Sequence, residues 1–160
     1  MANYEFITTW KLKSPLPPVW ATVADFGAWG RWWRGVSAQV LTPADESGLN
    51  GVHRFVFRSK LPYALTFDFQ TTRVEPMSNI AGKAIGDLHG TAEWTFAEQA
   101  DLTVVTCDWK VATTEAWMNL VAPVAGPVFR WNHHVIMDWG GHGLAADLKV
   151  DLVESSQRNG

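Results

Sequence analysis

The chain has 160 residues, of which 47% are hydrophobic and 18% are charged, a composition that fits one globular domain and excludes a disordered chain. Its 13 basic and 16 acidic side chains give a formal net charge of −3. This balance argues against a nucleic acid partner, because such affinity depends on the neutralisation of phosphates. Tryptophan is unusually frequent, with 10 residues.

The N-terminal sequence indicates neither secretion nor a membrane anchor. MANYEFITTW has no basic region followed by an apolar run, and no stretch of the chain has the apolar length that crosses a bilayer. The single cysteine, Cys107, allows no intramolecular disulfide and agrees with a reducing compartment. We therefore expect a cytoplasmic protein without integral membrane association, and the sequence leaves its oligomeric state open.

The N-terminal part of the chain predicts one strand followed by two short helices. Residues 4–12, YEFITTWKL, are rich in aromatic and β-branched side chains, as strands are. Ser14 suits a helix N-cap, and the prolines after it suit the first turn of a helix over Pro17–Phe26. Closely spaced glycines then limit the next segment, GAWGRWWRGV, to a short second helix that carries three tryptophans.

From Val36 onward the pattern changes to the two-residue alternation of strands. Candidate strands, separated by turn clusters such as PADESGLNG, cover residues 36–41, 52–58, 63–75, 79–86, 90–98 and 102–114. Because side chains alternate across a strand, one face of the predicted sheet is apolar and includes His53, Phe55, Phe57, Leu65, Phe67 and Phe69. Arg54 is then expected beside Asp68 on the opposite, solvated face.

The segment over residues 117–148 returns to helical spacing. One stripe of this predicted helix holds Trp117, Val121, Val128, Val135 and Trp139. Two prolines and a glycine inside the segment predict a kink or break, so that the regular helix begins near Val128. We expect one domain over residues 1–150, followed by a polar, frayed tail over residues 151–160.

The predicted order is a strand, two small helices, antiparallel strands and a long C-terminal helix. The segments VWATVADFGAWGRWWRGV, GDLHGTAEWTF, TVVTCDWKV and FRWNHHVIMDWGGHGLAADL follow one another in this order. Together they resemble the START-like (SRPBCC) superfamily, in particular its polyketide cyclase/dehydrase and lipid-transport branch, over residues 4–149. The resemblance implies an α+β helix-grip fold, in which a curved antiparallel sheet of six or seven strands wraps around the last helix.

The same resemblance implies an internal apolar cavity between the sheet and the last helix, which relatives use to hold lipids, hormones or polyketides. It does not imply one chemistry, and no catalytic residue set of the family can be matched to positions in this chain. Apolar pockets with a few polar groups are where small molecules bind. We therefore expect a small hydrophobic molecule, lipid-like, aromatic or polyketide-like, as the partner.

The candidate ligand-binding residues are the large side chains expected to line this cavity, together with one stripe of the last helix. They are Trp32, Trp33, Phe55, Phe57, Phe67, Phe69, Trp94, Trp109, Val128, Asn132, Val135 and Trp139. Aromatic rings provide rigid walls that pack offset or edge-on against a ligand. The alternative is that the same residues simply fill a closely packed core.

In GAWGRWWRGV the tryptophans are expected to turn inward and close one end of the sheet, while Arg31 and Arg34 stay in solvent. The alternative for the two arginines is a contact with an anionic lipid headgroup.

Asn132 falls within the apolar stripe of the last helix, where a polar group needs a partner. It either hydrogen-bonds a ligand or satisfies a neighbouring protein group or a water. His133 and His134 are expected to point away from this stripe. The spacing of His134, Asp138 and His142 is explained by a solvated helix face, so no metal and no cofactor is predicted.

Known catalytic patterns are not found. Cys107 lies on an apolar strand face, where a thiol behaves as a small hydrophobic group. Three function classes remain: a binding protein, a cyclase/dehydrase-type enzyme that uses Asn132, His142, Asp87 or His89 in the same cavity, and an interaction module with a vestigial cavity.

Overall fold

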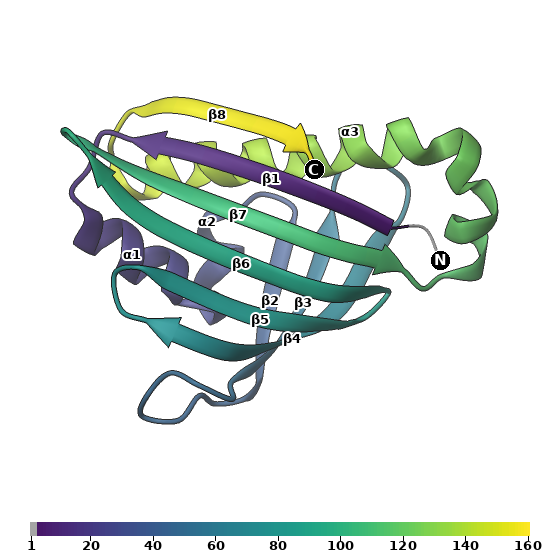
Figure 1. Cartoon of the computed structure of the whole chain (residues 1–160), viewed down its shortest axis with the longest axis horizontal. Coiled ribbons are helices and arrows are strands. Elements are labelled where there is room, and N and C mark those ends of the chain that lie inside the picture. Colours follow the sequence, from purple (N-terminus) through teal and green to yellow (C-terminus); the bar gives the residue numbers. More distant parts are fainter. Residues whose placement is uncertain (1–2) are drawn as a thin grey trace.

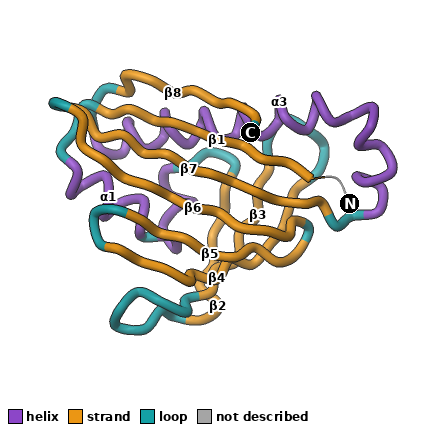
Figure 2. The backbone as a smooth tube through the Cα atoms, in the orientation of Figure 1, coloured by secondary structure: helices purple, strands orange, loops and turns teal. Residues whose placement is uncertain are grey.

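A computed structural model describes residues 3–160. Eight strands form one curved sheet, and the helices lie on one side of it (Figures 1 and 2). The strands are β1 (Asn3–Leu12), β2 (Val36–Thr42), β3 (Val52–Arg58), β4 (Ala64–Glu75), β5 (Asn79–Gly86), β6 (Leu88–Gln99), β7 (Leu102–Thr113) and β8 (Leu152–Asn159). The helices are α1 (Leu16–Ala24), a 3-10 turn (Phe26–Ala28), α2 (Trp29–Trp32) and α3 (Ala116–Leu148).

The sheet is antiparallel throughout, with the strand order β2-β3-β4-β5-β6-β7-β1-β8. The first strand of the chain is therefore next to the last hairpin, and α3 spans the concave side. This arrangement confirms the predicted α+β helix-grip fold. The predicted alternation also holds, since Arg54 on β3 and Asp68 on β4 form an ion pair on the outer face, with 2.8 Å between Nε and Oδ1.

The expected frayed tail over residues 151–160 was wrong, because Leu152–Asn159 forms the edge strand β8. The chain reverses at Lys149, whose φ of 57° is left-handed, and β8 then pairs antiparallel with β1. Backbone hydrogen bonds to an open sheet edge hold this strand in place. A search for apolar patterns misses such a strand, since its side chains are mostly solvated. The sheet consequently has eight strands, where six or seven were expected.

The last helix runs unbroken from Ala116 to Leu148 and contains Pro123 and Pro127. Its first turns bend away from the axis of the rest (Figure 1), which agrees with the expected kink. The prediction that the regular helix begins near Val128 was wrong, because the prolines bend the helix and do not end it.

The tryptophans of α2 and β1 fix the C-terminal half of α3 against the sheet. Trp10 Nε1 donates to Met137 O at 3.1 Å, and Trp33 Nε1 donates to Ile136 O at 2.8 Å. Both indoles reach the helix backbone because Gly140 and Gly141 have no side chain. A Cβ on Gly140 would lie 2.5 Å from Trp33 Cε2, and one on Gly141 would lie 2.8 Å from Trp10 Cδ1.

These glycines also explain why the predicted stripe of α3 has the wrong phase. The buried residues of α3 are Met118, Gly126, Ile136, Met137, Gly140, Gly141, Leu144 and Ala145. Val128 is instead 45% exposed, and Val135 and Trp139 are only half-buried at the edge of the helix. A hydropathy stripe follows large apolar side chains, whereas here glycines occupy buried positions.

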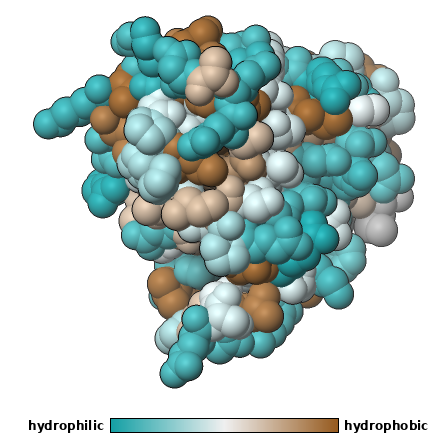
Figure 3. Space-filling model, turned by 60° about the vertical axis from the view of Figure 1, so that its left-hand side comes forward, coloured by the Kyte–Doolittle hydropathy of each residue, from teal (hydrophilic) through white to brown (hydrophobic). Residues whose placement is uncertain are grey.

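The tryptophans of GAWGRWWRGV turn inward, as predicted: Trp29, Trp32 and Trp33 are all buried. Arg31 and Arg34 remain exposed, and Arg31 pairs with Asp147 at 3.1 Å. The face of the molecule in Figure 3 is mostly hydrophilic, with smaller hydrophobic patches between the polar side chains. The segment therefore acts as a plug at one end of the core.

Replacement of Gly140 by alanine tests this close approach. Although alanine favours a helix by about 1 kcal/mol over glycine, the new methyl group overlaps both indoles, and overpacking of this kind costs about 1–3 kcal/mol. We expect a lower free energy of unfolding in urea for Gly140→Ala. Gly126→Ala on the same helix is the control and should stay within about 1 kcal/mol of the parent, because its Cβ meets only the flexible end of Arg130. Equal stability of the two variants would contradict the account.

Candidate functional site

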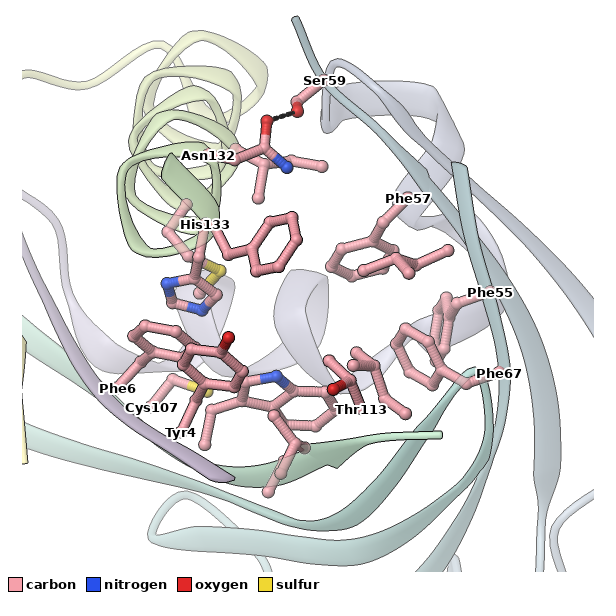
Figure 4. Close-up of a pocket in the computed structure, with 18 of the residues that line it drawn as sticks. Tyr4, Phe6, Phe55, Phe57, Ser59, Phe67, Cys107, Thr113, Asn132 and His133 are labelled. Carbon is pink, nitrogen blue, oxygen red and sulfur yellow. Dashed lines mark hydrogen bonds between the residues drawn. The ribbon is translucent and has the colours of Figure 1, made fainter. Parts of the chain in front are cut away.

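A cavity of about 90 Å³ lies between the concave face of the sheet and α3. Figure 4 shows Phe55, Phe57 and Phe67 on one wall, with Asn132 and His133 of α3 opposite them. The predicted site residues that line it are Trp33, Phe55, Phe57, Phe67, Phe69, Trp94, Trp109 and Asn132. The structure thus brings together side chains from both ends of the chain and from the middle of the sheet.

Four predicted site residues lie elsewhere. Trp32 is buried and stacks on Trp33, with 5.4 Å between ring centroids, but it does not line the cavity. Val128 is on the surface, and Val135 and Trp139 flank the buried face of α3. Their placement follows from the shifted phase of the helix.

Sequence reasoning missed lining residues on β1, on the turn after β3 and on α3. They include Tyr4, Phe6, Ser59, Tyr63, Phe129, His133, Ile136 and Met137. The alternation in YEFITTWKL places Tyr4 and Phe6 on the same face as Trp10, which was a usable signal. The four residues of α3 follow helical spacing, and the glycines after them mark the same face.

The walls of the cavity are aromatic side chains in mutual contact. Ring centroids are 5.7 Å apart for Phe55 and Phe67, 5.2 Å for Phe57 and Phe67, and 5.5 Å for Phe67 and Trp109. Trp29 stacks on Phe55 at 4.9 Å. These contacts tie the strands of the wall together, so the cavity has a rigid apolar side opposite the helix.

Asn132 has one partner within the protein. Its Oδ1 accepts a hydrogen bond from the Ser59 hydroxyl, which lies in the turn after β3 (Figure 4). The same view shows the amide nitrogen of Asn132 turned toward the cavity. The amide therefore satisfies a loop group with its oxygen and presents its donor side to the cavity interior.

His133 was expected to point away from the apolar stripe, and this was wrong, because the buried face of α3 passes through it. Its ring lies on Phe6, with 3.9 Å between centroids and 13° between planes. Within residues 3–160 its Nδ1 is buried and has no hydrogen-bond partner. Burial, together with the neighbouring His134, lowers the pKa of His133 to about 3. The imidazole is therefore neutral at physiological pH.

The other titratable groups of the lining are also uncharged near neutral pH. Burial raises the pKa of the Tyr63 phenol to about 12, and it raises the pKa values of Tyr4 and of the Cys107 thiol. Within the described residues 3–160, the lining includes no Asp, Glu, Lys or Arg. The cavity is thus free of net charge.

Three aromatic residues meet where the first half of α3 approaches the turn after β3. Ring centroids are 5.2 Å apart for Tyr63 and Trp117, 6.3 Å for Tyr63 and Phe129, and 6.4 Å for Trp117 and Phe129. Trp117 is 46% exposed, whereas Tyr63 and Phe129 line the cavity. This aromatic latch, defined by Tyr63, Trp117 and Phe129, separates the cavity from solvent.

The polar residues considered for an enzyme do not gather at the cavity, apart from Asn132. Asp87 Oδ2 accepts from the Thr66 amide at 2.8 Å, and His142 Nδ1 lies 2.9 Å from Asp138 O on an exposed part of α3. His89 is exposed as well. Among residues 3–160, no three His, Cys, Asp or Glu side chains are placed to hold a metal ion. None of the helices over the same residues is long and apolar enough to cross a membrane.

Comparisons with known proteins agree with the fold. Residues 12–136 match the family model described as polyketide cyclase/dehydrase and lipid transport. The chain is similar to a START superfamily protein from Mycobacterium smegmatis, with a TM-score of 0.71 and 14% identity, covering 91% of this chain and 97% of that one. For TTHA0849 from Thermus thermophilus the values are 0.71, 15%, 89% and 98%.

A third similar structure is the Zhui aromatase/cyclase from Streptomyces sp. R1128, with a TM-score of 0.67 and 13% identity, covering 92% of this chain and 96% of that one. No curated protein matches the chain. At these identities, the likeness to solved structures concerns the fold alone.

The neutral state of His133 makes stability depend on pH. Its pKa is about 3 in the folded protein and about 6.5 in an unfolded chain, so protons bind preferentially to the unfolded state. The stabilising effect is complete above about pH 6.5 and is lost as the pH falls toward 3, by about 1.4 kcal/mol for each pH unit. Between pH 6.5 and 4.5, the parent should lose about 2 kcal/mol more than His133→Leu in urea unfolding.

Both proteins keep the other histidines, so the difference between them isolates His133. Parallel stability curves for the two proteins would show that this imidazole is accessible to protons in the folded state.

Proposed function

Because the chain belongs to the polyketide cyclase/dehydrase and lipid transport family, we propose that it binds one small hydrophobic molecule in the cavity between the sheet and α3. The observation that carries this proposal is the aromatic cavity inside an otherwise closely packed core. Lipid-like, aromatic and polyketide-like molecules all fit its chemistry.

The energetic cost of the cavity supports a binding role over simple packing. An apolar cavity destabilises a fold by about 24 cal/mol for each Å³, which corresponds to about 2 kcal/mol for a volume of about 90 Å³. Phe57, Trp109 and Phe129 are only half-buried although they face the interior. A single larger side chain at Ala92, which also lines the cavity, would remove much of this space.

The size of the cavity limits what it holds in this closed form, since pockets for drug-sized ligands span about 300–1,000 Å³. A larger ligand requires the aromatic latch to separate. The segment beside the latch is the bent first part of α3, with Pro123, Gly126 and Pro127. Prolines remove helix hydrogen bonds, and this makes the segment the easiest part of α3 to move.

An enzyme of the cyclase/dehydrase type is the alternative function. One similar structure is described as an aromatase/cyclase, so the same cavity could process a polyketide-like molecule. Of the polar residues considered for this role, only Asn132 lines the cavity. The polar groups there serve hydrogen bonding better than acid–base chemistry, and binding is therefore the better supported function.

A cavity-filling pair of substitutions tests the location of binding. The uncharged dye N-phenyl-1-naphthylamine should bind the parent with a Kd in the micromolar range and change indole fluorescence, because Trp33, Trp94 and Trp109 line the cavity. Ala92→Leu and Ala92→Phe should weaken binding progressively, by at least about tenfold for Phe, since the new side chain occupies the ligand's space. Thermal unfolding checks that both variants are folded.

Thr91→Phe is the matched control. Thr91 precedes Ala92 on β6 and is exposed on the outer face of the sheet, so the same ring there should leave the dye affinity unchanged. If the parent binds no dye, or if the folded Ala92 variants bind it as the parent does, the ligand site is not this cavity.

A further inference from the structure

We infer that the cavity selects an uncharged ligand carrying a hydrogen-bond acceptor, such as a carbonyl oxygen, and that His133 and Asn132 supply the donors for it. This inference rests on the proposed binding function and adds the chemical class of the ligand.

The first step is the exclusion of charge. A carboxylate or ammonium group that enters the cavity loses its hydration, which costs several kcal/mol even after the protein relaxes. No Lys, Arg, Asp or Glu among residues 3–160 lines the cavity and offsets this cost. The cations nearby lie outside it: Arg130 is 5.3 Å from the Tyr4 ring centroid, Arg34 is 4.2 Å from that of Trp139, and neither lines the cavity.

The second step is the orientation of His133. Its ring is held by stacking on Phe6, at 3.9 Å between centroids. A neutral imidazole has one N–H donor and one lone pair. Since Nδ1 is buried without a partner, and a buried N–H without a partner is rarer than an unpaired acceptor, we assign the lone pair to Nδ1 and the hydrogen to Nε2. Nε2 is not enclosed in this way, and it is the donor available to a ligand.

The third step is the state of the neighbouring amide. The Ser59 hydroxyl occupies Oδ1 of Asn132, and the Nδ2 group faces the cavity. The Thr113 hydroxyl, also in the lining, already donates to Asn119 Oδ1 at 2.8 Å. The amide of Asn132 and the imidazole of His133 therefore both present donors, and the complementary ligand group is an acceptor oxygen.

These steps define a chemical class. Ketones, esters, lactones and quinones with an apolar body fit, because they combine an acceptor oxygen with no charge. Free fatty acids and aromatic carboxylates do not fit at neutral pH, because they are ionised.

Three naphthalene compounds of similar shape test the inference on the parent protein: 2-acetylnaphthalene, 2-ethylnaphthalene and 2-naphthoate. Their affinities are measured at pH 7.5 by displacement of N-phenyl-1-naphthylamine. The ketone should bind about three- to tenfold more tightly than the ethyl compound, which matches the net value of a hydrogen bond. The carboxylate should bind at least about a hundredfold more weakly than the ketone, owing to the cost of its desolvation.

Two substitutions then assign the donors. In Asn132→Leu and in His133→Phe, the affinity of the ketone should fall toward that of 2-ethylnaphthalene, while the affinity of the ethyl compound stays nearly constant. Val128→Ala, on the exposed side of α3, is the control and should change neither affinity. The ratio between the two ligands is insensitive to a general loss of stability, so it separates a donor role from a structural one.

The outcomes distinguish this inference from the proposed function. If the dye binds and the carboxylate equals the ketone, or if the ketone has no advantage over the ethyl compound, the inference is wrong and the binding function stands. If neither the dye nor any of the three compounds binds the folded parent, both are wrong.

Discussion

The architecture depends on the contact between two indoles and the backbone of α3. Trp10 and Trp33 donate to carbonyl groups of the helix, and they come this close only because Gly140 and Gly141 lack side chains. This contact fixes the C-terminal half of the helix and fills the core at that end. The N-terminal half has no such clamp, and its separation from the sheet leaves the cavity.

The position of the clamp also explains the character of the cavity. Its inner end consists of tryptophans from the plug, its walls are the aromatic rings of β3, β4 and β7, and its outer end is the latch around Tyr63. The hydrophilic groups that face it are neutral amide, hydroxyl and imidazole groups of residues such as Asn132 and His133. A rigid apolar chamber with a few neutral donors and one softer end is suited to hold a small uncharged molecule.

The sequence predicts the sheet better than the helix. Alternation along a strand assigns faces directly, so Phe55, Phe67 and Trp109 are found on the correct side. The phase of α3 is misjudged because glycines mark its buried face, and with it His133 is missed. β8 is missed because backbone pairing, and not apolar burial, holds it. The bond from Ser59 to Asn132 joins residues distant in the chain, and no local pattern indicates it.

Xenon is the most direct probe of the claim that the clamped core leaves an apolar cavity beside α3, because empty apolar cavities in proteins bind it. The measurement is a crystal structure of the parent protein under xenon pressure. The account predicts xenon between Phe67, Trp109 and Ile136, with the indoles of Trp10 and Trp33 still bonded to the helix. Side chains that fill this space, with xenon absent from it, would contradict the account.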